Sequence, residues 1–227
     1  MEAGSVRLTV RAHYARFDAA RRAGYSAYMS TTENLFVTKL HRAELGRRLN
    51  AELERTCLAI AAEDRAGQRW AREHGYEGYT SYASLNDLTV RASVFEALER
   101  LIAIEVHSFA KALDVERPRA LKLDSLWINV MPKGGVHTAH IHPQSAISGT
   151  YYVTTPNGAA ALKFEDPRLA MMMAAPAKKA KAKRENQSFV SIAPKPGTLL
   201  LWESFLRHEV PLNRARGQRI SISFNYA

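Results

Sequence analysis

The sequence predicts a mainly antiparallel β domain that is preceded by a helical segment. The first half of the chain carries apolar residues at three- and four-residue spacings, which are typical of amphipathic helices. The second half carries short alternating runs separated by turn residues and without helical patterns between them, which favours a sandwich or barrel. A chain of 227 residues is short enough for one core. We therefore expect a single domain over 1–227, with a mainly helical part over 1–120 and a β core over 121–227.

Two helices are expected in the first part. The run "AELGRRLNAELERTCLAIAAE", about residues 43 to 63, repeats an apolar residue every three or four positions. A second stripe of this kind spans about residues 90 to 113. The segment between them, 74–88, is rich in Gly, Tyr, Ser and Asn, so we expect a loop that packs across one end of a sheet.

Six strands are expected after residue 120. Their sequences are "SLWINVM", "SGTYYVTT", "ALKFED", "SFVSIA", "GTLLLW" and "RISISFNY". The segment from about 167 to 188 interrupts them and is rich in Pro, Ala, Met and Lys, which indicates an insertion. Such an insertion can form a lid over a site.

The net charge of +10, from 32 Lys and Arg against 22 Asp and Glu, favours an anionic partner such as nucleic acid, a carrier-bound substrate or an organic acid. Five of the positive charges lie in "KKAKAKR", residues 178 to 184, where no aromatic residue can stack on a base. A solvated loop explains this run, and nucleic acid is the less favoured partner.

The sequence shows no sign of a membrane segment or a secretory leader. No run approaches the roughly 18 apolar residues of a membrane helix. The first residues, "MEAGSVRLTVRAHYARFD", lack an apolar centre. Cys57 is the only cysteine, so the chain can form no internal disulfide, in agreement with a reducing compartment. We expect a cytoplasmic protein, and a homodimer is an open alternative to a monomer.

Histidines gather in "GGVHTAHIHPQSAISGTYYV", residues 134 to 153. Because alternate residues of an extended segment point to the same side, His140 and His142 can face one pocket, while His137 lies on another phase. His208 follows a buried run at another strand end. Imidazoles at strand ends across a barrel can converge on a divalent metal, so we expect a metal site here.

The last run, "RISISFNY", has one polar face and one apolar face. Arg219, Ser221, Ser223 and Asn225 share the polar face, and the apolar residues between them share the other. If the apolar face packs on helices or on a second sheet, the Arg219 guanidinium points into the barrel, where an unpaired charge is costly. A carboxylate fits a guanidinium through two parallel hydrogen bonds, so we expect an anionic cosubstrate beside the metal.

Taken together, these motifs resemble the iron(II)- and 2-oxoglutarate-dependent oxygenases. The order is His-x-His, a distal His, and Arg-x-Ser eleven residues later. "GYTSYASLNDL", "LWINVMPKGG", "HIHPQSAISGTYYV", "FEDPR", "PGTLLLWESFLRHEV" and "RISISFN" are similar to a little-characterised bacterial group within that superfamily. The resemblance covers about residues 74 to 226. It implies an α+β fold with a double-stranded β-helix, jelly-roll or cupin-like, flanked by N-terminal helices, and it implies Fe(II) and 2-oxoglutarate.

The resemblance also implies roles for individual residues. His140 would be the first metal ligand, His208 the distal ligand, and Arg219 with Ser221 the clamp for the far carboxylate of 2-oxoglutarate. His142 stands where the family has a carboxylate ligand. Either His142 is itself a ligand, or water completes the site and His142 lies behind it, or Asp166 supplies a carboxylate from elsewhere.

Other residues near the motif are given weaker roles. Asn129 and Tyr152 either bind 2-oxoglutarate from adjacent strands or simply line the barrel. His137 is expected to be a loop or substrate-side residue, and Trp127 and Trp202 to be core residues.

The function that follows is an Fe(II)- and 2-oxoglutarate-dependent dioxygenase. We expect it to use O2 to hydroxylate an unactivated C–H bond of an amino acid, a peptide or a natural-product intermediate, and to release succinate and CO2. The alternative is a non-catalytic, cupin-like module that binds a metal and a small acid, or senses them.

Overall fold

The computed structural model describes residues 30–227. The chain divides into two compact units, Met1–Thr38 and Lys39–Ala227, and every helix and strand described below belongs to the second. Residues 1–18, in which no secretory leader is expected, lie outside the described residues. A single domain over 1–227 stays a prediction.

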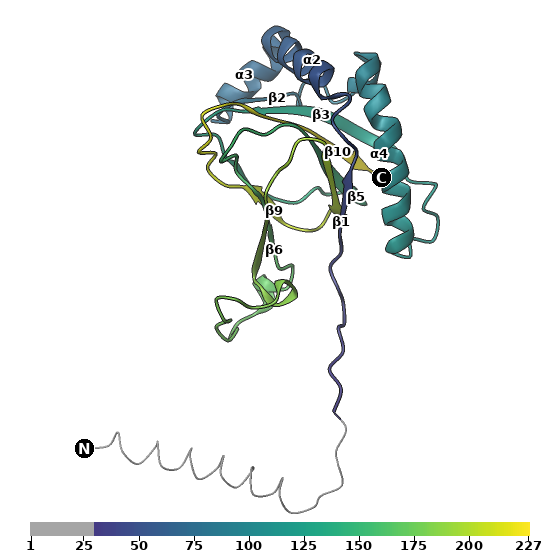
Figure 1. Cartoon of the computed structure of the whole chain (residues 1–227), viewed down its shortest axis with the longest axis vertical. Coiled ribbons are helices and arrows are strands. Elements are labelled where there is room, and N and C mark those ends of the chain that lie inside the picture. Colours follow the sequence, from purple (N-terminus) through teal and green to yellow (C-terminus); the bar gives the residue numbers. More distant parts are fainter. Residues whose placement is uncertain (1–29) are drawn as a thin grey trace, which may run out of the picture. The chain divides into compact units, whose positions relative to one another are not determined.

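Two antiparallel sheets form the centre of the second unit (Figure 1). The larger has the order β1 (Leu40–Glu44), β8 (Thr198–Glu203), β5 (Ile147–Thr154), β10 (Arg219–Tyr226), β3 (Leu123–Met131) and β2 (Tyr79–Thr80). The smaller has the order β4 (His137–His140), β9 (His208–Val210), β6 (Leu162–Glu165) and β7 (Phe189–Ile192). The predicted fold class, a double-stranded β-helix with flanking helices, is confirmed.

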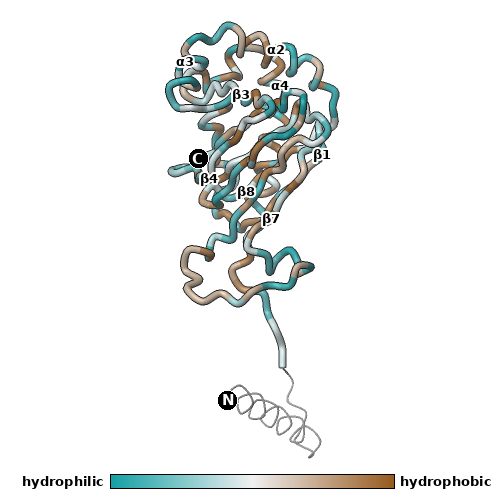
Figure 2. Tube along the Cα trace, turned by 90° about the vertical axis from the view of Figure 1, so that its left-hand side faces the viewer, coloured by the Kyte–Doolittle hydropathy of each residue, from teal (hydrophilic) through white to brown (hydrophobic). Residues whose placement is uncertain are grey.

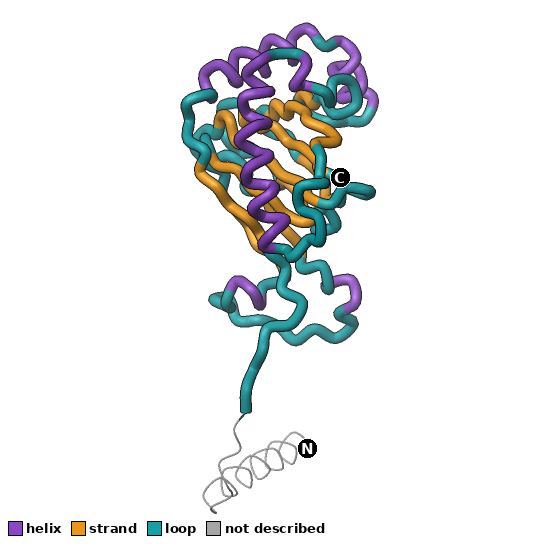
Figure 3. Tube along the Cα trace, turned by 90° about the vertical axis from the view of Figure 1, so that its right-hand side faces the viewer, coloured by secondary structure: helices purple, strands orange, loops and turns teal. Residues whose placement is uncertain are grey.

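Within the described part of the chain, three α-helices cover the outer face of the larger sheet. They are α2 (Asn50–Glu63), α3 (Arg65–Glu73) and α4 (Ser93–Ala112), and the 3₁₀ turn η1 (Leu88–Val90) precedes α4. Figure 3 shows α4 lying across the strands of this sheet. Leu98 and Ile102 of α4 share a buried cluster with Ile222 and Phe224 of β10, so helices and sheet enclose the main core. None of the helices in residues 30–227 is long and apolar enough to cross a membrane.

A second apolar cluster lies on the inner side of the larger sheet, between it and the smaller one. Its largest members are Tyr152, Trp202 and Phe164, all of which are buried. The hydropathy colouring in Figure 2 shows apolar residues along β3 and β8. Trp202 is therefore a core residue, as predicted, although it also lines the pocket described below.

The helical prediction for residues 43–63 was wrong at its start. Ala43 and Glu44 belong to β1, which pairs with β8, and α2 begins only at Asn50. The helix ends before Asp64, whose carboxylate accepts a hydrogen bond from Gly67 N at 3.0 Å and so caps α3. The second predicted helix corresponds to α4.

All six predicted strands are present, but β1, β2, β4 and β9 were not predicted. Each of the four has at most five residues, so an alternation of polar and apolar side chains is hard to recognise, although β6 and β7, with four residues each, were predicted. The predicted loop over 74–88 contains β2, which pairs with β3 at Tyr79 and Thr80.

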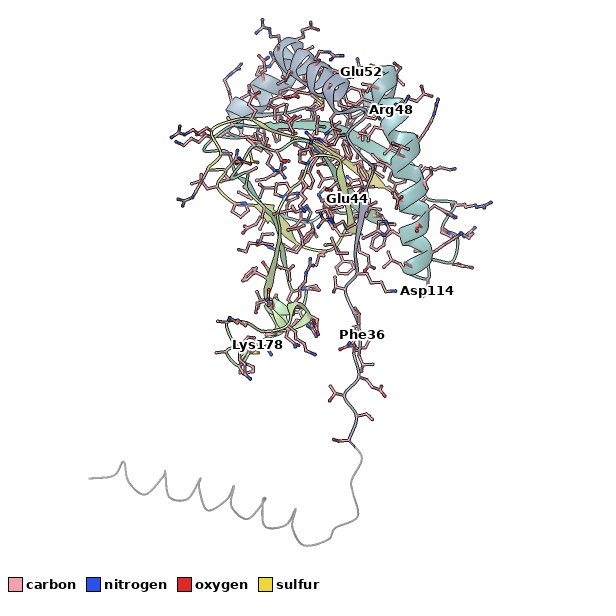
Figure 4. The ribbon with its side chains drawn as sticks, in the orientation of Figure 1. Phe36, Glu44, Arg48, Glu52, Asp114 and Lys178 are labelled. Atoms are coloured by element: carbon pink, nitrogen blue, oxygen red, sulfur yellow. The ribbon has the colours of Figure 1, made fainter. Side chains whose placement is uncertain are left out.

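The insertion over 167–188 connects β6 to β7 and contains the turns η2 (Leu169–Met171) and η3 (Arg184–Asn186). Its two ends are joined by a hydrogen bond from Asp166 N to Ser188 O at 2.9 Å. Almost every residue between them is exposed, and Met173 is 99% exposed. Figure 4 shows Lys178 on this segment, away from the strands.

We predict that deletion of 177–186 leaves the melting temperature within about 2 °C of the intact protein, because exposed segments contribute little free energy of unfolding. As a matched comparison, Leu162→Ala truncates a core residue of β6 that is 3% exposed and should cost about 2–5 kcal/mol. Thermal unfolding of both variants checks this. A deletion as damaging as Leu162→Ala would show that the insertion packs on the core.

Candidate functional site

A pocket opens inside the barrel between the two sheets. It is lined by Trp127, Asn129, Met131, His137, His140, His142, Gly149, Thr150, Leu162, Trp202, His208, Val210, Arg219, Ser221 and Ser223. Among residues 30–227, the lining contains four histidines and one arginine but no carboxylate. A pocket of this composition suits a metal together with an anion.

Three of the histidines converge. His140 in β4 stands directly opposite His208 in β9, which places their side chains side by side. His142 lies two residues past His140 and its backbone N–H donates to Ser204 O at 3.0 Å. Each imidazole offers one nitrogen, and the three nitrogens all lie within 4.8 Å of one another. Such a group can hold a divalent metal.

In each of the three histidines, ring nitrogen Nδ1 already has a hydrogen-bond partner. Nδ1 lies 2.7 Å from Thr138 O in His140 and 2.8 Å from Leu206 O in His208. In His142, Nδ1 lies 2.7 Å from Oδ1 of Asn225. Carbonyl and amide oxygens only accept, so Nδ1 carries the proton in each ring. Nε2 is then the nitrogen left for a metal.

Burial keeps these imidazoles neutral. It lowers the pKa of His208 to about 3 and that of His142 to about 4, and in both cases the neighbouring His140 lowers it further. Burial also lowers the pKa of His140 itself. Neutral imidazole is the form that binds metal, so burial leaves these histidines in the protonation state that can ligate.

Arg219 is buried deeper in the same pocket, at 3% exposed. One terminal nitrogen donates to Ser221 Oγ at 3.2 Å, and the guanidinium carbon lies 5.1 Å from the centre of the Tyr152 ring. Its Nε has no hydrogen-bond partner, and no carboxylate within residues 30–227 forms a salt bridge with it. A buried guanidinium without an acid is costly, so it requires an anion.

Other unpaired polar atoms surround Arg219 and the histidines. Within residues 30–227, no hydrogen-bond partner exists for Tyr152 Oη, Asn129 Oδ1, Trp202 Nε1 or His142 Nε2. Buried polar atoms are nearly always paired in folded proteins. Asn129, Trp202 and His142 line the pocket, and Tyr152 is not part of its lining but lies beside Arg219. This concentration of unpaired atoms indicates a polar ligand.

Tyr76 was missed by sequence reasoning. Its buried hydroxyl is also unpaired, and its ring meets that of His137 edge-on at 5.4 Å. Burial raises the Tyr76 pKa to about 12, and the nearby Arg219 guanidinium opposes this effect. The residue belongs to "GYEGY", where the resemblance begins, but a loop sequence does not reveal which way a side chain points.

His137 lines the pocket, whereas Asp166 lies outside its lining. His137 begins β4, lines the pocket and stacks on His140 with ring centres 4.7 Å apart. Asp166 bonds Arg168 at 2.9 Å and lies outside the pocket lining and the histidine group. It is therefore not positioned as the missing carboxylate ligand.

The comparison with protein families decides the class. Residues 125–225 match the model of the family described as "Putative 2OG-Fe(II) oxygenase". Residues 125–225 are thus similar to the 2OG-Fe(II) oxygenases. The predicted family, an oxygenase enzyme and the cofactors Fe(II) and 2-oxoglutarate are thereby confirmed. Among curated proteins, no match was found.

Solved structures share the fold at low identity. A prolyl-4-hydroxylase from Pseudomonas putida is 13% identical over 83% of this chain and 92% of its own, with a TM-score of 0.54. The epimerase SnoN of nogalamycin biosynthesis is 13% identical over 83% and 78%, with a TM-score of 0.55. A prolyl hydroxylase from Trichoplax adhaerens, solved with a peptide of hypoxia inducible factor, is 14% identical over 82% of each chain, with a TM-score of 0.53.

The buried histidines predict a pH dependence for the metal-free protein. The pKa of His137 and of His208 falls to about 3 and that of His142 to about 4, against an ordinary 6.5. Below pH 6.5 the unfolded chain binds protons that the folded chain does not, so stability falls as pH drops from 6.5 towards 3. Each such histidine contributes a slope of up to about 1.4 kcal/mol per pH unit.

Urea unfolding of the metal-free protein at pH 7.5, 6.0 and 5.0 measures this slope. His137→Gln should reduce it by the share of one histidine. A free energy of unfolding that stays constant over this range would contradict the burial of neutral imidazoles.

Proposed function

We propose that the protein uses Fe(II), held by His140, His142 and His208, and 2-oxoglutarate, held by Arg219, to hydroxylate a C–H bond of its substrate. The observation that carries the proposal is a buried arginine without an acid partner in the same pocket as three convergent imidazole nitrogens. When bound, Fe(II) and 2-oxoglutarate supply the oxidising chemistry, in which one oxygen atom reaches the substrate and the other enters succinate.

Residues of the chain would bind the cosubstrate, orient the His142 ring and exclude water. Arg219, with the Ser221 hydroxyl beside it, would fix the far carboxylate, and Tyr152 and Asn129 offer unpaired polar atoms along the same ligand. Trp127 stacks on His142 with ring centres 5.8 Å apart and restricts the rotation of that ring. Buried aromatic walls also exclude water, which strengthens every polar contact inside.

The electrostatics favour a doubly negative cosubstrate. Three neutral imidazoles leave the charge of a divalent metal uncompensated, Arg219 adds another positive charge, and the lining holds no carboxylate. A dianion that reaches both the metal and Arg219 neutralises charges that the chain itself leaves open. This supports 2-oxoglutarate as the ligand rather than a neutral molecule.

The substrate class is proposed from the fold neighbours and the pocket rim. Two of the neighbours are named as prolyl hydroxylases and one as an epimerase from nogalamycin biosynthesis. We propose an amino acid, a peptide or a natural-product intermediate for this chain. Tyr82 is 49% exposed and meets the pocket-lining Trp127 edge-on at 5.1 Å, which would provide an aromatic surface for such a substrate.

The test of the function is formation of succinate from 2-oxoglutarate by the purified protein with Fe(II) under air, first without any primary substrate. The proposal predicts slow succinate formation that depends on both iron and oxygen. Binding of metal and 2-oxoglutarate without any succinate would instead support the non-catalytic sensing module.

Replacement of each proposed metal ligand by alanine should reduce the amount of iron bound, to different degrees. His140→Ala and His208→Ala should abolish binding of one iron per chain, and His142→Ala should lose most of it, because each removes one of three nitrogens. His74→Ala is the control, since this histidine is exposed on the surface. Metal analysis after anaerobic loading provides the measurement. Wild-type iron affinity in His142→Ala would make water the third ligand.

Arg219→Ala should raise the Michaelis constant for 2-oxoglutarate steeply, by the equivalent of about 2–5 kcal/mol, because it leaves the carboxylate buried without a partner. Iron should stay bound. Arg214→Ala serves as the control because Arg214 is exposed. An unchanged constant in Arg219→Ala would move the carboxylate clamp to another residue.

A further inference from the structure

Asn225, near the end of β10, contacts the one histidine of the group whose ring is held by a side chain. The Nδ1 partners of His140 and His208 are the backbone carbonyls of Thr138 and Leu206, each two residues earlier in the chain. His142 lies past the end of β4. Its Nδ1 partner is Oδ1 of Asn225, 83 residues away, at 2.7 Å.

The strand register holds Asn225 between two serines. Asn225 stands opposite Ser125 of β3 on one side and opposite Ser148 of β5 on the other. Its Nδ2 donates to Ser125 Oγ at 3.2 Å, and Ser148 Oγ donates to its Oδ1 at 2.8 Å. All three residues are at most 5% exposed. In this orientation both atoms of the amide are hydrogen-bonded, and its oxygen faces His142.

Ser204 extends this network to the backbone of His142. Its hydroxyl lies 2.7 Å from that of Ser148, and its carbonyl accepts the backbone N–H of His142 at 3.0 Å. Both the ring and the backbone of His142 are thus fixed by one buried cluster, made of Ser125, Ser148, Ser204 and Asn225. The remaining ring nitrogen, Nε2, is buried and has no partner in residues 30–227.

We infer that Asn225 is a positioning residue that holds His142 in the Nδ1–H tautomer and presents its Nε2 to the metal, an inference that rests on the proposed metal centre. A positioning residue is needed because position 142 is a histidine rather than a carboxylate. A carboxylate can ligate through either oxygen, but an imidazole ligates only through a nitrogen without a proton. A neutral His142 with its proton on Nε2 could not join His140 and His208.

The chemistry also predicts what other residues at 225 would do. Leucine branches at the same carbon as asparagine but is bulkier and can neither donate nor accept a hydrogen bond, so His142 would no longer be held in one tautomer. Aspartate keeps the acceptor and adds a negative charge behind the imidazole, which makes the ring a stronger ligand. The two variants separate the hydrogen bond from the packing of the site.

The first measurement is the tautomer of each histidine in the metal-free wild-type protein, from nitrogen-15 NMR with labelled histidine. The expected result is the Nδ1–H form for His142, as for His140 and His208. A proton on Nε2 of His142 would overturn the inference. This measurement needs no metal and no variant.

The second measurement is the affinity for Co(II), an air-stable stand-in for Fe(II), followed by its visible absorption. Asn225→Leu should mix the His142 tautomers and weaken Co(II) binding roughly 10- to 100-fold, while Asn225→Asp should keep the tautomer and bind at least as tightly as wild type. Asn50→Leu is the matched control, because Asn50 is also a buried asparagine with both amide atoms bonded, but in α2. It should lose stability without losing Co(II) affinity.

Two results would contradict the role of Asn225. One is a folded Asn225→Leu protein with the wild-type tautomer and Co(II) affinity. The other is an Asn225→Asp protein as weak as Asn225→Leu, which would show that only packing matters. Failure of the wild-type protein to bind Co(II) would contradict the proposed metal centre instead, and the NMR measurement distinguishes the two cases.

Discussion

The burial of β10 on both faces is the constraint on which the rest of the structure depends. This strand pairs with β3 on one side and β5 on the other, and helices cover its apolar face. Its alternate residues Arg219, Ser221, Ser223 and Asn225 therefore point into the barrel, where each polar group needs a partner. Ser223 finds Asn129 and Thr150, and Asn225 finds His142 and two serines. Within residues 30–227, Arg219 bonds Ser221 and lies over the Tyr152 ring but forms no salt bridge, so its charge remains for a ligand.

One strand thus connects the two ends of the site. At one end of β10, Arg219 faces the pocket, and six residues along, Asn225 holds the ring of His142. Because alternate residues of a strand share a face, both side chains lie on the same wall of the barrel. In the proposed centre, the distance between Arg219 and the metal would be set by backbone geometry rather than by a flexible loop. This rigidity suits a ligand that must reach both positions at once.

The position of a histidine at 142 changes the charge of the site. A carboxylate there would carry part of the compensating negative charge, whereas three neutral imidazoles carry none. The buried pocket cannot import a solvated counterion easily, and its lining offers no acid. Binding of the metal and binding of a dianion should therefore support each other, since each lowers the electrostatic cost of the other.

Much of the fold could be predicted from the sequence because it depends on local patterns. The alternation in "RISISFNY" identifies β10 and its two faces, and the stripe of α4 identifies the helix. The pattern fails where elements are short or pair at a distance. Ala43 and Glu44 fit a helical stripe, yet they belong to β1, which pairs with β8.

For the site, too, some residues could be predicted from the sequence and others could not. His140 and His208 could be proposed from strand ends and from the resemblance. Their direct opposition follows only from the pairing of β4 with β9, which no local pattern reveals. Tyr76 and the contact of Asn225 with His142 were not predicted, because they join segments that are far apart in the chain. Tertiary pairing, not residue type, creates these contacts.

A crystal structure of the protein grown anaerobically with Fe(II) and 2-oxoglutarate tests the central claim most directly. The claim predicts one metal with Nε2 of His140, His142 and His208 at roughly 2.1 Å, a normal metal–imidazole distance, and Arg219 bonded through two nitrogens to the far carboxylate. A metal bound elsewhere, or a 2-oxoglutarate molecule whose far carboxylate does not touch Arg219, would contradict it.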